Sequence, residues 1–125
     1  MSNPIYRQGP IGKDAASAVS KGRLVKLTAG GKVEHAGATG AVFGAITEKA
    51  DPAKLISAVD VAVHYGSAVV ALSVVDGDEI AAGAAVFAAA DGQVASTGTV
   101  QVGVAHIPSA DGFVETILNN LPVAG

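Results

Sequence analysis

The sequence predicts an all-β protein, a small barrel or sandwich of short strands, and three observations support this. Half of the 125 residues are hydrophobic, but 25 of these are Ala, so the 18 Val residues are the main supply of larger apolar side chains. Val favours strands because its branched Cβ is stiff and fits a pleated surface. Turn-forming pairs such as Gly30-Gly31 and Asp91-Gly92 recur between the apolar segments, and one hairpin pattern occurs twice.

The repeated pattern spans residues 22–33 and 83–94. Four residue pairs, each 61 positions apart, are identical between the copies: Gly22/Gly83, Val25/Val86, Gly31/Gly92 and Val33/Val94. A similar strand pattern follows each copy, at Ala41–Ile46 and at Val100–Ala105. The spacing predicts an internal duplication of a hairpin unit. The alternative is that a chain of this composition reuses the same turn chemistry.

Strands are expected wherever Val-rich segments lie between turn signals. The expected strands are Leu24–Leu27, Lys32–His35, Ala41–Thr47, Asp60–Tyr65, Ala68–Val75, two within 83–94, Val100–His106 and Phe113–Leu118. The expected structural turns include Gly31, Gly66, Asp91, Gly92 and Gly112. Gly66-Ser67 is expected to close a two-residue hairpin. One short helix is expected over Ala53–Ala58, because Asp51-Pro52 suits a helix start.

The organisation expected from the sequence is an extended N-terminal arm (1–20), a β domain (21–118) and a short tail (119–125). Pro4, Gly9, Pro10 and Gly12 disfavour regular structure near the N-terminus. Segment 14–20 fits either a helical turn or a strand. Ile5, Tyr6, Arg7 and Ile11 are therefore the candidate residues for contact with another chain. Apolar side chains on an arm are either solvated or laid on a neighbour, and Arg7 could pair with an acidic partner surface.

Charge excludes several classes of partner. The formal net charge is −3, and the eight Lys and Arg are scattered before residue 55. A nucleic-acid partner is not expected, because binding phosphates needs clustered positive charge. No apolar run is long enough to cross a membrane, no signal-peptide layout is present, and the absence of Cys excludes disulfides and thiolate metal sites. Charged residues are only 15% of the chain, which suggests burial against other chains.

The sequence contains no recognisable catalytic or cofactor motif, so an enzyme is not expected. His35, His64 and His106 lie on different expected strands and lack metal-ligand spacing. The acidic segment Asp76–Glu79 lacks the later ligands of a calcium loop, and Gly30-Gly31-Lys32 is followed by Val33 where a phosphate loop has Ser or Thr. We expect no cofactor and no metal.

Segments Ala18–Leu27 and Ile80–Phe87, each followed by a glycine turn and later by a Phe-Gly-Ala or Val-Gly-Val strand, resemble the small capsid decoration (cement) proteins of tailed bacteriophages. Segment Ala110–Leu118 is similar to the end of that family. The resemblance covers most of the chain and implies a β-rich homotrimer on the outer capsid surface of the virion. There it would lock neighbouring major capsid proteins together at threefold positions, after synthesis in the host cytoplasm.

Two other classes of function remain open on the sequence. A small β-barrel that binds a ligand or peptide would be a monomer with a well-formed pocket and convergent polar groups. A small enzyme that uses the histidines would retain zinc or iron.

Overall fold

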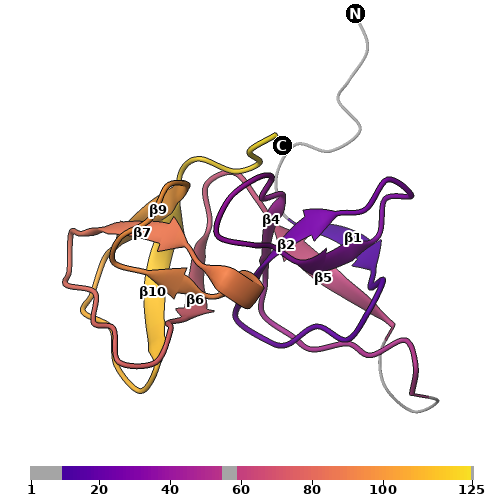
Figure 1. The fold of residues 1–125 in the computed structure, drawn as a ribbon, viewed down its shortest axis with the longest axis horizontal. Coiled ribbons are helices and arrows are strands. Elements are labelled where there is room, and N and C mark those ends of the chain that lie inside the picture. The colour runs from indigo at the N-terminus through magenta and orange to yellow at the C-terminus, as the bar shows by residue number, and fades with distance from the viewer. Residues whose placement is uncertain (1–9, 55–58, 125) are drawn as a thin grey trace, which may run out of the picture.

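The structure, a computed structural model, describes residues 10–54 and 59–124, which form two five-stranded antiparallel sheets lying side by side (Figure 1). The expected all-β fold is confirmed. Sheet one has the order β1-β5-β4-β2-β3 and sheet two the order β6-β10-β9-β7-β8. The strands of sheet one are β1 (Ile11–Asp14), β2 (Arg23–Leu27), β3 (Val33–His35), β4 (Gly44–Ile46) and β5 (Asp60–His64). Those of sheet two are β6 (Val69–Ser73), β7 (Ala85–Ala88), β8 (Val94–Ala95), β9 (Gln101–Ala105) and β10 (Phe113–Leu118).

The two sheets have the same topology: the order of sheet two is that of sheet one with five added to each strand number. The register agrees as well, because Val25 pairs with Gly44 in sheet one and Val86 pairs with Gly103 in sheet two. We call the segment 11–64 unit one and the segment 69–118 unit two. The chain is therefore a tandem repeat of a five-stranded unit, and the repeat is larger than the hairpin that the sequence indicated.

Contacts outside the strand ladders repeat in the same way. The parallel bridge between Ala15 and Val33 in unit one has its counterpart between Val74 and Val94 in unit two. The Ala15 amide donates to the Val59 carbonyl at 2.8 Å, and the Val74 amide donates to the Gly112 carbonyl at the same distance. These long-range matches show that β1 is the counterpart of β6 in the repeat, and that β5 is the counterpart of β10.

Each unit has a buried core on the inner face of its sheet, but the larger core draws on both units. The smaller core consists of unit-one residues such as Val25, Ile46 and Val63. The larger core contains the unit-two residues Val86 and Leu118 and also four residues from unit one: Leu24, Ala36, Val42 and Ala45. Leu24 and Ala45 lie on the face of sheet one that is opposite the smaller core, and Ala36 and Val42 lie just outside the strands. Together the four side chains join the units into one body.

Two expectations about local structure are wrong. No α-helix occurs in the described residues, where the helical element is a single 3₁₀ turn, η1 (Ala90–Gly92). Of the helix expected over Ala53–Ala58, residues 53 and 54 lie in a turn, in which the Ala53 amide donates to Asp51 Oδ1 at 3.0 Å, and residues 55–58 lie outside the described residues. The Asp51 side chain therefore closes a local turn.

The second wrong expectation concerns Gly66. It was expected to close a hairpin between the strands now seen as β5 and β6, but these strands belong to different sheets. Gly66 has φ of +70°, and its amide donates to the Leu121 carbonyl at 3.2 Å. The segment is thus the link between the two units. The Gly66-Ser67 link resembles a hairpin turn in sequence because both need a glycine in the left-handed conformation.

The N-terminal boundary also differs from the expected one. Residues 11–14, which were assigned to the arm, form β1 and pair with β5 from Ile11 opposite Val63 to Asp14 opposite Asp60. Residues 1–9 lie outside the described residues. A Gly and Pro-rich entry is compatible with β1 because β1 is the edge strand of sheet one in the described structure.

Candidate interaction surfaces

The two units meet where η1 of unit two lies against β2 and β3 of unit one (Figure 1). The Gly92 amide donates to the Ala36 carbonyl at 2.7 Å. A Cβ added at Gly92 would lie 2.6 Å from the Leu24 carbonyl oxygen and 3.1 Å from Arg23 Cβ. This approach is possible only for glycine, so Gly92 fixes the distance between the units.

A charged cluster surrounds this contact. Arg23 Nη1 lies 3.2 Å from Asp91 Oδ2 and donates to the Asp91 carbonyl at 2.9 Å. His35 Nδ1 lies 2.7 Å from Asp91 Oδ1, and the Ser20 amide donates to His35 Nε2 at 3.0 Å. Because Nε2 accepts a hydrogen bond, the proton on the neutral ring is on Nδ1, which donates to the carboxylate. The cluster fixes the η1 turn to sheet one.

The hydrogen bond from His35 is the main cause that lowers the pKa of Asp91 from its ordinary value of 3.8. The charge of His35 when protonated contributes less, followed by the hydrogen bond and the charge of Arg23. The pKa of Asp78 is also lowered, chiefly because the Ser96 amide and hydroxyl donate to its carboxylate. For such groups the unfolded chain binds protons more readily than the folded chain. Their stabilisation is therefore fully present above the unfolded pKa and is lost as the pH falls through the folded pKa.

We expect Asp91→Asn to reduce the stability of the protein near neutral pH and to flatten its loss of stability below about pH 4. Asn accepts the left-handed conformation of Asp91, whose φ is +57°, so this variant removes the charge with little added backbone strain. The measurement is urea unfolding from pH 7 to pH 2.5. Asp111→Asn is the matched control, because Asp111 also has a positive φ, +54°, and lies outside the charged cluster. Equal pH dependence of the two variants would contradict the role given to Asp91.

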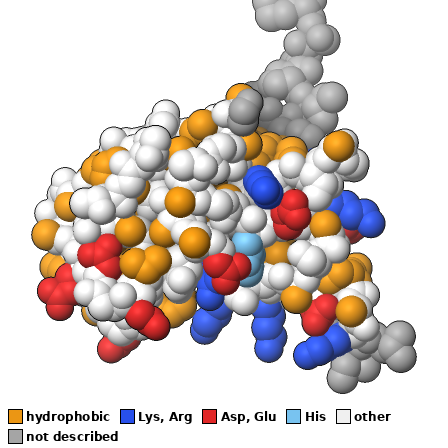
Figure 2. All heavy atoms as spheres, in the orientation of Figure 1, with side chains coloured by type: hydrophobic (Ala, Val, Ile, Leu, Met, Phe, Trp, Pro, Cys, Tyr) orange, Lys and Arg blue, Asp and Glu red, His pale blue; other side chains and the backbone are white. Residues whose placement is uncertain are grey.

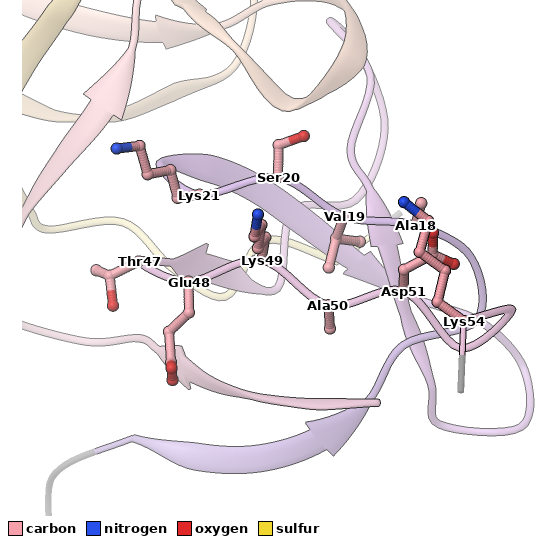
Figure 3. Close-up of a pocket in the computed structure, with 10 residues that line it drawn as sticks. All are labelled: Ala18, Val19, Ser20, Lys21, Thr47, Glu48, Lys49, Ala50, Asp51 and Lys54. Carbon is pink, nitrogen blue, oxygen red and sulfur yellow. The ribbon is translucent and has the colours of Figure 1, made fainter. Parts of the chain in front are cut away.

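A groove of about 570 Å³ lies between residues 18–21 and 47–51 of unit one (Figure 3). Its two sides are joined by hydrogen bonds between the backbones of Val19 and Ala50. The Lys21 and Lys49 side chains extend to one side in Figure 3, whereas Glu48 extends to the other. The equivalent place in unit two, lined by Glu79, Ile80, Ala81, Pro108 and Ser109, is a groove too. The groove is thus a feature of the repeat. In unit one, the Lys21 and Lys49 side chains do not converge with that of Glu48 on one ligand position.

The structure locates some of the residues predicted to form an interface. Ile5, Tyr6 and Arg7 lie outside the described residues. Ile11 is half-buried in β1, opposite Val63. The predicted turn residues all have positive φ: Gly31 (+86°), Gly66 (+70°), Asp91 (+57°), Gly92 (+72°) and Gly112 (+79°).

The histidines do not come together. His35 bonds Asp91, and His106 Nε2 lies 2.9 Å from Glu115 Oε1. His64 is in β5. Among residues 10–54 and 59–124, no three His, Asp or Glu side chains are grouped so that they could hold a metal ion. Within the same residues no helix is long and apolar enough to span a membrane.

The fold defines a class: an all-β protein built from two five-stranded antiparallel units. The same fold is found in the N base of head fiber gp8.5 of bacteriophage phi29. That structure matches with a TM-score of 0.69 and 16% sequence identity, over 95% of this chain and 100% of that one. No protein-family model and no curated protein matches the sequence. The structural likeness is thus to the base of a phage head fiber.

Proposed function

We propose that this chain is a structural protein of a phage head. It binds the outer surface of the capsid as a homotrimer and stabilises contacts between major capsid proteins. The observation that carries the proposal is the likeness to the phi29 head fiber N base, which spans nearly the whole of both chains. The sequence resemblance to capsid decoration proteins points independently to a phage head.

The surface chemistry supports a position outside the shell. A net charge of −3 is unsuited to contact with packaged DNA, because such contact is favoured by positive charge. Low charge content and many small side chains suit a protein that buries much of its surface between subunits. The ligand-binding alternative is less well supported, since the polar side chains of the groove in Figure 3 diverge.

The N-terminal arm is part of this proposal. Residues 1–9 carry Ile5, Tyr6 and Arg7, and they precede the edge strand β1. We assign these three side chains to contact with the capsid or with a neighbouring subunit. Ordering nine residues costs on the order of 10 kcal/mol of backbone entropy. Apolar burial alone does not offset that cost, so backbone hydrogen bonds to the partner contribute as well.

The test is co-sedimentation of the purified chain with phage heads that lack it. We expect the full chain to sediment with the heads and a chain lacking residues 1–9 to bind at least tenfold more weakly, with its melting temperature unchanged. The deletion stops at residue 9 because Ile11 and Gly12 belong to β1. A second variant keeps the arm length but carries Ile5→Ser and Tyr6→Ser. It should bind as weakly as the deletion if these side chains make the contact. Full-strength binding by both variants would remove the arm from the proposal, and a full chain that stays in solution would contradict the function itself.

A further inference from the structure

The outer face of sheet two carries a row of apolar side chains that crosses four strands. Ala85 pairs with Val104, Val104 with Ile117, and Ile117 with Val69, so the four side chains are cross-strand neighbours. Val69 is 57% exposed and Ile117 is 41% exposed. We call these four residues the apolar row.

Two of the four equivalent positions of sheet one are covered by unit two, and the other two, His64 and Pro10, are half-exposed and exposed. The shared register places Leu24 at the position of Ala85, and Ala45 at the position of Val104. Leu24 and Ala45 are fully buried and belong to the core that contains the unit-two residues. The part of this face that lies on β2 and β4 is therefore buried in the first copy of the repeat, whereas the corresponding part on β7 and β9 is half-exposed in the second copy.

The turn that covers sheet one has an open counterpart as well. Residues 89–93 of unit two correspond to residues 28–32 of unit one, since the Ala89 amide donates to the Gln93 carbonyl and the Thr28 amide to the Lys32 carbonyl. A Cβ built at Gly31 meets no heavy atom of the described residues beyond its chain neighbours within 4 Å. Within the described residues, the turn of unit two rests on the face of sheet one. The turn of unit one and the equivalent face of sheet two make no such contact in this part of the chain.

The charged cluster changes between the copies in a correlated way. Gly30 stands at the position of Asp91, while Ala84 and Ser96 stand at the positions of Arg23 and His35. The acid and both of its partners are absent together. A contact between the turn of unit one and the face of unit two would therefore not bury a carboxylate, a guanidinium or an imidazole of this kind without its partner.

Charge also favours this pairing. Unit one carries seven Lys or Arg and five Asp or Glu, a formal charge of +2, whereas unit two carries six Asp or Glu and no Lys or Arg, a formal charge of −6. In Figure 2 the basic side chains lie over and below sheet one, and the charged side chains at the left end, over sheet two, are acidic. Contact between unit one of one molecule and unit two of another is attractive, while contact between two copies of unit two is repulsive.

We propose that a second copy of this chain covers the apolar row, with its 28–32 turn seated beside β7 and β8. The contact repeats between molecules the arrangement that joins the two units within one molecule. It is head-to-tail, so it uses one turn and one face of every copy and closes into a ring when the rotation permits. The inference deepens the homotrimer of the proposed function, but its test uses the purified chain without capsids.

The first experiment is sedimentation equilibrium at 0.15 M salt. The expected mass is three times the 12.2 kDa of one chain, falling with added salt because the contact is electrostatically favoured. Ile117→Lys should weaken association at least tenfold. Ile107→Lys is the matched control, because Ile107 has the same 41% exposure and lies outside the apolar row. Deletion of residues 1–9 should leave the association in place.

The second experiment uses the absence of Cys from the chain. A chain with both Gly30→Cys and Ala84→Cys should give dimers and trimers on mild oxidation, and Gly30→Cys with Ile107→Cys should not. A monomeric chain, equal association of the two Lys variants, loss of association on arm deletion, or equal cross-linking of the two Cys pairs would overturn the proposal. A trimer that passes these tests but does not bind phage heads would retain the contact and refute the capsid function.

Discussion

Gly103→Ala is expected to reduce the free energy of unfolding by about 3 kcal/mol or more, which corresponds to roughly 10 °C in melting temperature. Gly103 lies in β9, and a Cβ there would press against the Ile117 carbonyl oxygen and lie 2.8 Å from Thr116 Cγ2. Backbone atoms cannot turn away as a side chain can, so β9 and β10 must separate and their hydrogen bonds weaken.

Gly44→Ala tests the same idea in unit one. Gly44 is the register equivalent of Gly103, and its Cβ would press against the His64 carbonyl oxygen and lie 2.7 Å from Val63 Cγ1. Because the repeat places both glycines at one position, the two losses should be similar. Gly12→Ala is the control, since Gly12 also lies in a strand but has open space at its Cβ. Urea unfolding of all three variants is the measurement. If both core variants lose no more than the control, the close strand approach in the structure is wrong.

The second large effect is expected at the contact between units. Gly92→Ala should cost about 3 kcal/mol, while Gly31→Ala should cost only about 1 kcal/mol. Both glycines have positive φ, +72° and +86°, so both variants include the same kind of backbone strain. Only at Gly92 does the added methyl meet the neighbouring unit, 2.6 Å from the Leu24 carbonyl oxygen.

The difference between these two variants isolates the contact between the units from the conformational cost of Ala in a left-handed turn. Thermal unfolding at a concentration where the chain is monomeric gives both values under one condition. Ala90→Gly serves as a further control in η1, because Ala90 is exposed and its change removes only a methyl group. Equal losses for Gly92→Ala and Gly31→Ala would indicate that η1 does not rest on sheet one.

The repeated hairpin could be predicted from sequence because tight turns restrict residue choice. Gly31 and Gly92 need positive φ, and Gly44 and Gly103 need a missing Cβ, so these positions kept glycine in both copies. The outer strands lacked such markers. Ile11 aligns with Val70 and Lys13 with Leu72, and strand pairing tolerates these differences. For this reason β1 was assigned to the arm.

The contacts between the units could not be predicted from local patterns. Asp91 lies 68 residues from Arg23 and 56 from His35, so no short motif connects them. Leu24 and Ala85 occupy the same strand position with the same alternation, yet one is buried and the other is half-exposed. Which face another unit covers depends on packing over long sequence distances, and periodicity reports only the two faces of a strand.

Electron cryomicroscopy of phage particles from the strain that encodes this chain tests the proposed function most directly. The particles should be imaged with the gene intact and with it deleted. The account predicts three copies of the two-unit fold on the outer surface of the shell at local threefold positions, and loss of that density from the deletion particles. Identical maps of the two particles, or density for the chain only inside the shell, would contradict it.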